Sequence, residues 1–124
     1  MNLLLDTHAL LWWLDDAPAL STRARAAIAD GRNPVFVSAV VVWELRIKEA
    51  LGKVKLPRNF RAVLERQPFE SLPITAEHAH AVAALPRLHR DPFDRMLVAQ
   101  ARAESFVLVS HAPVMARYGI EVIW

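Results

Sequence analysis

Short apolar runs alternate with helix-like segments along the whole chain, and this alternation is the feature that most constrains the fold. Each run is three or four residues long and rich in Leu, Val and Ile. Strands that alternate with helices predict a mostly parallel sheet of roughly five strands covered on both faces, which is a three-layer α/β/α domain. The runs are Leu3–Leu5, Val35–Val37, Leu72–Ile74, Phe106–Val109 and Ile120–Ile123.

Capping residues mark several of the intervening helices. Ser21 precedes the segment TRARAAIADG, and Ser38 precedes AVVVWELRIKEALG, which ends at Gly52. Thr75 opens TAEHAHAVAAL, and Pro86 closes it. Ser and Thr favour helix starts, whereas Gly and Pro favour helix ends, so we predict helices in these three segments.

Length and composition set the class of protein. The chain has 124 residues, 54% of them hydrophobic, which suffices for the core of one domain spanning residues 1–124. It contains no cysteine, which excludes disulfides, thiolate zinc sites and cysteine nucleophiles. No apolar stretch approaches the ~20 residues that span a bilayer, and acids interrupt the amino-terminal run. We expect a cytoplasmic protein with no membrane segment and no signal peptide.

Basic residues crowd two segments, although the formal net charge is only +2. One interpretation is two solvated helix faces. The other is a basic rim that holds a polyanion over bound cations, with Arg46 and Arg95 as contacts. The residues are Arg46, Lys48, Lys53, Lys55, Arg58 and Arg61 in the first segment, and Arg87, Arg90, Arg95 and Arg102 in the second.

Asp6 directly follows the first apolar run. Ligands of open parallel sheets bind beyond the carboxyl ends of the strands, so Asp6 is placed where binding sites are built. Ser38 and Ser110 follow other runs and are expected at the same edge. A desolvated carboxylate costs several kcal/mol unless it is paired, hydrogen-bonded or bound to a metal, so Asp6 requires a partner from elsewhere in the chain.

Glu44 is the first candidate partner. It lies six residues beyond Ser38, in the second turn of the helix that leaves the second strand. The alternative is an exposed helix glutamate that pairs with Lys48 four residues further on, a contact worth about 0.2–0.5 kcal/mol. The residues alone leave both interpretations open.

The segment HRDPFDRMLVAQA supplies two more acids. Asp91 fits an N-cap, Pro92 the first helical position and Asp94 the third, in capping-box spacing. Capping accounts well for Asp91. Asp94 opens an apolar, small-residue helix that must be buried, so we expect its side chain to face the crevice, where the helix amino terminus keeps it ionised.

Carboxylates gathered in this way repel one another unless cations lie among them. Oxygen ligands without Cys or clustered His suit Mg²⁺ or Mn²⁺. Two such ions about 3.5–4 Å apart can activate a water and stabilise the leaving oxygen of a phosphodiester. The acids therefore indicate phosphodiester chemistry.

Histidines and tryptophans are assigned to other roles. The histidines lack the spacing of metal ligands and are interpreted as surface or supporting residues. The tryptophans are interpreted as core or dimer anchors rather than a base-stacking platform. These residues are His8, His78, His80 and His89, and Trp12, Trp13 and Trp43.

Four segments in order resemble the PIN-domain family, specifically the toxin ribonucleases of VapBC toxin-antitoxin systems. They are LLLDTHALLWW, VSAVVVWELRIKEALGKVKLP, HRDPFDRMLVAQA and LVSHAPVMARYGIEVIW, and they run nearly end to end. Each motif alone is modest, but all four in this order are specific. The resemblance implies a PIN-like fold, a homodimer and a cognate VapB-type antitoxin that blocks the site. Contact surfaces are expected at ALLWWL and in the segment after Glu44.

The resemblance also implies roles for the acids. Asp6, Glu44 and Asp94 would be the catalytic residues that bind Mg²⁺ or Mn²⁺. The metal would activate water for in-line attack on an RNA phosphodiester, leaving 5′-phosphate and 3′-hydroxyl ends. The residues implied to support them are Asp91, as a helix cap and nearby acid, and Thr7 and Ser38, through their hydroxyl groups.

The chain departs from the family pattern at Ala112. The family commonly has an aspartate just after the fourth strand, and Ala112 occupies the matching position. Ala112 also precedes Pro113 where a helix would take an Asp cap, and alanine is a poorer N-cap than Asp by about 1 kcal/mol. Ser110 or His111 could compensate in part.

Two alternatives to an active ribonuclease follow. The first is a catalytically impaired PIN-like domain that binds RNA or antitoxin without efficient cleavage, and Ala112 supports it. The second is a receiver-like or phosphatase α/β domain, which also places acids at strand ends. The helical position of Glu44 and the missing lysine at a late strand end argue against this second alternative.

Overall fold

The computed structural model describes residues 1–124 and contains one five-stranded sheet. The strand order is β3-β2-β1-β4-β5, and every neighbouring pair is parallel. Parallel alignment brings the carboxyl ends of all strands to one edge. The strands are β1 (Leu3–Leu5), β2 (Val35–Ser38), β3 (Glu70–Leu72), β4 (Val107–Val109) and β5 (Val122–Ile123).

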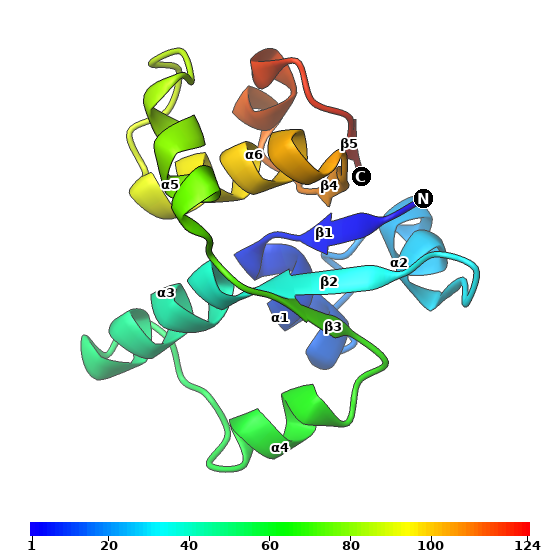
Figure 1. Cartoon of the computed structure of the whole chain (residues 1–124). Coiled ribbons are helices and arrows are strands. Elements are labelled where there is room, and N and C mark those ends of the chain that lie inside the picture. Colours follow the sequence, from blue (N-terminus) through cyan, green and yellow to red (C-terminus); the bar gives the residue numbers. More distant parts are fainter.

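Helices cover both faces of the sheet (Figure 1). α5 and α6 lie on one side of the strands, and α1 and α2 lie on the other. The predicted three-layer α/β/α architecture is therefore confirmed. None of the helices combines the length and the apolar character needed to cross a lipid bilayer. The helices are α1 (Thr7–Leu14), α2 (Thr22–Ala29), α3 (Ala39–Ala50), α4 (Phe60–Glu65), α5 (Ala76–Ala83), α6 (Pro92–Glu104) and the 3₁₀ helix η1 (Pro113–Tyr118).

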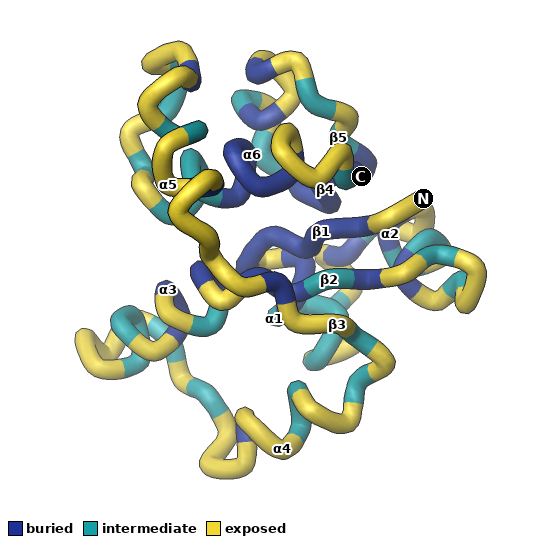
Figure 2. The backbone as a smooth tube through the Cα atoms, in the orientation of Figure 1, coloured by how far each residue is buried: buried dark blue, intermediate teal, exposed yellow.

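β1 is the central strand and the centre of the core. Its three leucines, Leu3, Leu4 and Leu5, are fully buried, with β2 on one side and β4 on the other. Figure 2 shows that burial is concentrated in β1 and in the helices beside it, whereas α4 and the loop before it are largely exposed. Burial on both faces explains why this strand is a continuous apolar run rather than an alternating one.

The predicted helix starts are confirmed. The hydroxyl oxygens of Ser21, Ser38 and Thr75 each accept a hydrogen bond of 3.0–3.1 Å from a backbone N–H in the first turn of α2, α3 and α5. α3 ends at Ala50, and Gly52 follows with a φ of +72°, a conformation that favours glycine. Local capping chemistry thus sets these boundaries.

The third strand lies two residues earlier than predicted. The predicted run was Leu72–Ile74, but β3 spans Glu70–Leu72 and pairs with Phe36–Ser38 of β2. Pro73 has no backbone N–H to donate to a ladder, so pairing ends before it. The exposed Glu70 and Ser71 suit an edge strand, since one side of the strand faces solvent.

Replacing Leu4 by Ala should lower the free energy of unfolding by roughly 2–5 kcal/mol, because it removes fully buried methyl groups from the central strand. Arg58→Ala is the control, since Arg58 is exposed in the loop before α4. Its effect should stay within about 0.5 kcal/mol. Urea denaturation measures both values, and equal effects would contradict this description of the core.

Candidate metal centre

Asp6 lies directly after β1 and caps α1. Its Oδ1 accepts a hydrogen bond from the Ala9 N–H at 2.8 Å, and the residue is only 5% exposed. Burial raises the pKa of Asp6 above its usual value, and hydrogen bonds from the Ser110 hydroxyl and the Ala9 N–H oppose this only in part. The expected position at the carboxyl edge of the sheet is observed.

Glu44 is buried in the second turn of α3 and is 3% exposed. One carboxylate oxygen accepts a hydrogen bond from the Thr7 hydroxyl, and the other lies 2.6 Å from Lys48 Nζ. Thr7 thus contacts one of the predicted site acids, and its role as a supporting residue stays a prediction. The pairing with Lys48 also occurs, but with a buried rather than an exposed glutamate.

Lys48 contributes a fixed positive charge to this region. Its hydrogen bond to Glu44 is the main reason why the pKa of Lys48 is raised above its usual value. The negative charges of Glu44, Asp91 and Asp94 act in the same direction. The ammonium group therefore stays protonated at neutral pH.

Asp94 lies in the first turn of α6 and contacts His89. Its Oδ2 is 2.9 Å from His89 Nε2. His89 Nδ1 accepts a hydrogen bond from the Arg90 N–H. In the neutral ring the N–H is therefore at Nε2, which donates a hydrogen bond to Asp94. Burial and the charge of Asp91 raise the pKa of Asp94 to about 6.

Asp91 is the N-cap of α6, as predicted. Its Oδ1 accepts hydrogen bonds from the N–H groups of Phe93 at 2.8 Å and Asp94 at 3.2 Å. The Asp94 side chain does not complete a capping box, because it turns to His89 instead. Asp91 thus caps the turn that carries Asp94, and the contact with His89 orients the Asp94 side chain.

Asp6, Glu44, Asp91 and Asp94 form what we call the carboxylate site. The charge of Glu44 contributes to raising the pKa of both Asp6 and Asp94, so Glu44 lies close enough to act on both carboxylates. No three acidic or histidine side chains converge on one ion-sized position, and both Glu44 oxygens are held by Thr7 and Lys48.

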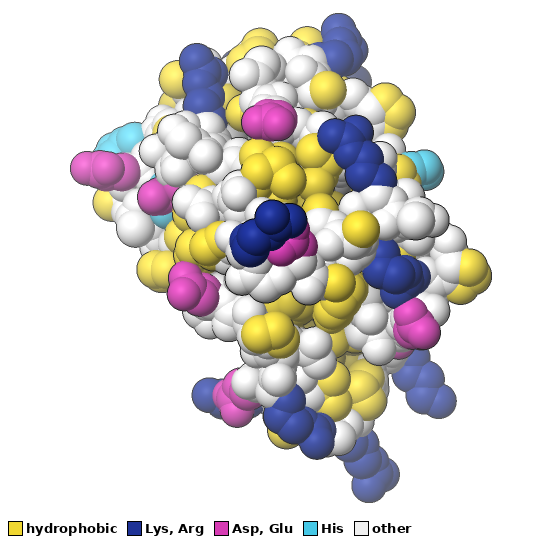
Figure 3. Space-filling model, turned by 90° about the vertical axis from the view of Figure 1, so that its right-hand side faces the viewer, with side chains coloured by type: hydrophobic (Ala, Val, Ile, Leu, Met, Phe, Trp, Pro, Cys, Tyr) yellow, Lys and Arg dark blue, Asp and Glu magenta, His cyan; other side chains and the backbone are white.

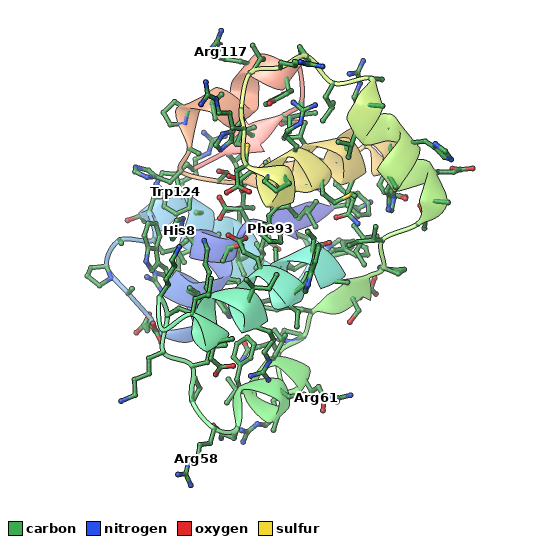
Figure 4. All side chains as sticks on the ribbon, turned by 90° about the vertical axis from the view of Figure 1, so that its left-hand side faces the viewer. His8, Arg58, Arg61, Phe93, Arg117 and Trp124 are labelled. Atoms are coloured by element: carbon green, nitrogen blue, oxygen red, sulfur yellow. The ribbon has the colours of Figure 1, made fainter.

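Figure 4 faces the carboxyl edge of the sheet. His8 and Trp124 lie together on one side of this edge, and Phe93, next to Asp94, lies further along it. The acids therefore have aromatic rings in their surroundings as well as charged groups.

The chemistry of these side chains, as distinct from their present arrangement, suits a divalent cation. Every side chain of the carboxylate site offers hard oxygen ligands, which Mg²⁺ and Mn²⁺ prefer. The raised pKa values of Asp6 and Asp94 identify carboxylates that burial and mutual repulsion destabilise in their ionised form. Lys48 offsets only the charge of Glu44. A metal ion bound by Glu44 would compete with Lys48 for the same carboxylate.

The Ser38 hydroxyl does not support the carboxylates directly, contrary to expectation. It donates a hydrogen bond to Gln100 Oε1 at 2.6 Å and accepts one from the Val40 N–H. Gln100 is fully buried and requires partners for its amide, so Ser38 is committed to joining β2 to α6.

Arg46 and Arg95 both make contacts within the chain. Arg46 pairs with Glu49 at 2.9 Å. Arg95 donates hydrogen bonds to the backbone carbonyls of Pro86 and Val82, which fixes the connection between α5 and α6. Their contact with RNA stays a prediction. On the face opposite the carboxylate site, Lys and Arg are scattered among Asp and Glu (Figure 3), as expected for solvated surfaces.

Ala112 is the N-cap residue of η1 and makes no side-chain cap bond. Its own N–H donates to Ser110 Oγ at 3.1 Å. The sequence-based expectation of an uncapped helix start at this position is confirmed. Ser110 therefore links this turn to Asp6, whose pKa its hydroxyl lowers.

Comparison with known proteins identifies the class. A family model described as PIN domain matches residues 3–120, and the chain belongs to this family. No curated protein matches it in sequence. VapBC2 from Rickettsia felis, solved bound to a DNA fragment from their promoter, matches with a TM-score of 0.75 and 18% identity, covering 99% of this chain and 98% of that one.

Two further solved structures share the fold. FitAcB from Neisseria gonorrhoeae matches with a TM-score of 0.67 and 22% identity, covering 98% of this chain and 96% of that one. The PIN domain endonuclease Utp24 matches with a TM-score of 0.58 and 16% identity, covering 98% of this chain and 82% of that one.

Asp94→Asn should stabilise the protein at neutral pH in metal-free buffer. The pKa of Asp94 is about 6 in the folded protein against 3.8 ordinarily, so the folded state holds the proton more tightly. Stability of the parent must then fall as pH rises from about 4 to 6. At 1.36 kcal/mol per pKa unit, Asp94→Asn can raise the free energy of unfolding by at most about 3 kcal/mol. The gain is smaller by the amount that the interaction with His89 stabilises the parent.

Urea unfolding of parent and variant at pH 4 and pH 7 measures this effect. The stability gained by Asp94→Asn should be larger at pH 7 than at pH 4. An equal gain at the two pH values would show that Asp94 has an ordinary pKa.

Ala112→Asp should add the missing cap of η1. In metal-free buffer this contributes about 0.5–2 kcal/mol, offset in part by repulsion from nearby acids. With Mn²⁺ the new acid should tighten ion binding, so the rise in thermal midpoint on adding Mn²⁺ should exceed that of the parent. Equal Mn²⁺-induced shifts in the two proteins would place position 112 outside the metal site.

Proposed function

We propose that this PIN domain is a divalent-metal-dependent endoribonuclease and the toxin of a toxin-antitoxin pair. The observation that carries the proposal is the set of buried acids, Asp6, Glu44 and Asp94, at the carboxyl edge of a parallel sheet. The similarity to the VapBC2 and Utp24 structures supports the assignment, and RNA as substrate follows from the sequence resemblance.

Asp6, Glu44 and Asp94 would hold Mg²⁺ or Mn²⁺. When bound, the metal would activate a water and offset negative charge on the scissile phosphate. The Ala9 N–H keeps Asp6 oriented at the start of α1. The Thr7 hydroxyl does the same for Glu44, so two residues in the first turn of α1 position two of the three acids.

His89 and Lys48 contact two of these acids as well. His89 Nε2 donates its proton toward Asp94 and orients that carboxylate. Lys48 is partly exposed and permanently charged, so it attracts a phosphate group toward acids that would otherwise repel it. The negative site is thereby made approachable for a polyanion.

An apolar groove beside α3 is the surface that we assign to the antitoxin. It has a volume of about 920 Å³, lies between α3, α4 and β3, and is lined by Val42, Trp43, Phe60, Leu64 and Phe69 among others. Trp43 packs against Phe93, the residue before Asp94, with ring centroids 5.3 Å apart. A peptide segment seated in the groove would therefore end close to the carboxylate site and block access to it.

Homodimerisation stays a prediction, and α3 offers apolar side chains for it. Trp43 is 58% exposed and Leu51 is 64% exposed. The segment ALLWWL is a poorer candidate than expected, because Ala9 and Leu10 are buried and the remaining residues pack partly against the core.

Cleavage of a single-stranded RNA labelled at its 5′ end tests the proposed activity. The parent should cut in Mg²⁺ or Mn²⁺ and stop cutting in EDTA. Asp6→Asn and Asp94→Asn should each reduce the rate by about 100-fold or more, since even losing a residue that only supports a metal ligand costs about 10- to 100-fold. Asn is as good an N-cap as Asp, so Asp6→Asn keeps the start of α1.

Asp16→Asn is the matched control. Asp16 is exposed, and its φ of +49° suits Asn as well as Asp. Its cleavage rate should equal that of the parent. RNA binding without metal-dependent cleavage by the parent would instead support the impaired PIN-like domain, which Ala112 favours.

A further inference from the structure

Four aromatic rings gather beside the carboxylate site. His8 and Trp12, one turn apart on α1, stack with ring centroids 5.3 Å apart and planes at 28°. Trp12 also contacts His111 at 6.2 Å and Trp124 at 5.6 Å, and these two lie 5.3 Å from each other. We call His8, Trp12, His111 and Trp124 the aromatic cluster.

The cluster comes from three elements that meet at the carboxyl edge of the sheet. His8 lies two residues after Asp6 and is close enough to influence the pKa of that carboxylate. His111 directly follows Ser110, whose hydroxyl bonds to Asp6, and Trp124 follows β5. Figure 4 shows His8 and Trp124 side by side at this edge. The cluster therefore lies at the same edge of the sheet as Asp6.

Core packing does not explain the outer half of the cluster. Trp12 and Trp124 are partly buried against the core, but His8 and His111 are exposed. Neither imidazole makes a hydrogen bond within the protein. Two exposed rings are thus held against two half-buried indoles without a polar contact of their own.

We propose that the aromatic cluster binds an unpaired nucleobase adjacent to the phosphate held at the carboxylate site. The inference rests on the proposed nuclease function and adds a base-binding subsite to it. Stacking on aromatic rings is how single-stranded nucleic acids are bound without strict sequence preference. A base within a duplex is already stacked and paired, so the subsite selects single-stranded RNA.

This assignment reverses the sequence-based interpretation of Trp12 as a core or dimer anchor rather than a base-stacking platform, and it separates Trp12 from Trp13. Trp13 packs against Phe69 and donates its indole N–H to Gln67 Oε1 at 3.1 Å. Its ring therefore has protein partners on the far side of α1. Trp13→Leu is accordingly the matched control for Trp12→Leu on the same helix.

A cycle of protein and RNA changes tests the proposal. The Asp94→Asn protein holds the RNA uncut, and the probe is a fluorescein-labelled six-nucleotide RNA, intact or with one abasic ribose at each position in turn. Fluorescence anisotropy in Mg²⁺ measures each dissociation constant. Trp12→Leu should weaken binding of the intact RNA about 5- to 100-fold, the range expected for one stacked base. Trp12→Phe should retain most of the affinity, and Trp13→Leu should change it less than twofold.

In the Asp94→Asn protein with Trp12 intact, an abasic ribose at one position should weaken RNA binding by a similar factor. When Trp12→Leu is added, the same abasic ribose should cause no further loss of affinity. The same abasic penalty in both proteins overturns the proposal. His8→Ala, at an exposed position, serves in place of Trp12→Leu if the latter does not fold. Unchanged RNA affinity together with loss of a dimer in sedimentation would make the cluster a protein interface instead.

The two proposals fail differently. A protein that binds no RNA in any form overturns the proposed function and the base-binding subsite together. A protein that binds and cleaves RNA, but shows no coupling between Trp12 and any base, overturns only the subsite.

Discussion

The burial of Asp6 at the end of β1 is the constraint on which the rest of the site depends. β1 is enclosed by β2 and β4, so the residue that ends it has little contact with water. The chain compensates by starting α1 at once, and the Ala9 N–H then faces the carboxylate. Desolvation still dominates its pKa. An acid kept there in spite of its cost is typical of a functional group rather than a structural one.

Glu44 and Lys48 show how the fold tolerates a second buried acid so close by. A lone ionised glutamate at this depth would be strongly destabilising, whereas one with a hydroxyl and an ammonium partner is not. Because Lys48 is partly exposed, it can release Glu44 to a competing cation at moderate cost. The ion pair thus compensates the buried charge of Glu44 without closing the site.

Much of the fold was predictable because its signals are local. Ser38 caps α3 wherever that helix packs, and an acid directly after a central strand must lie at the sheet edge. The predicted position of β3 was wrong because its pairing with β2 ends at Leu72, directly before Pro73. An apolar run alone does not reveal where such pairing begins and ends. α4 escaped prediction because it is only 6 residues long, too short for helical periodicity to stand out.

The site was less predictable, since it depends on burial and on contacts between distant segments. The spacing of Glu44 and Lys48 is the same whether the pair is exposed or buried, so the sequence left both interpretations open. The bond between His89 and Asp94 depends on how the loop before α6 turns. Trp12 and Trp13 are adjacent in sequence and differ only in which neighbours the fold brings to them.

The position of Asp94 depends on a polar network remote from the acids. Gln100, two turns further along α6, accepts a hydrogen bond from Ser38 at the end of β2. Its amide nitrogen lies 3.3 Å from His78 Nδ1, and His78 Nε2 lies 2.9 Å from Glu104 on the same helix. This buried network ties α6 to β2 and α5, so the helix cannot slide along the sheet without leaving polar groups unpaired. Side chains outside the carboxylate site thereby fix the helix that carries Asp94.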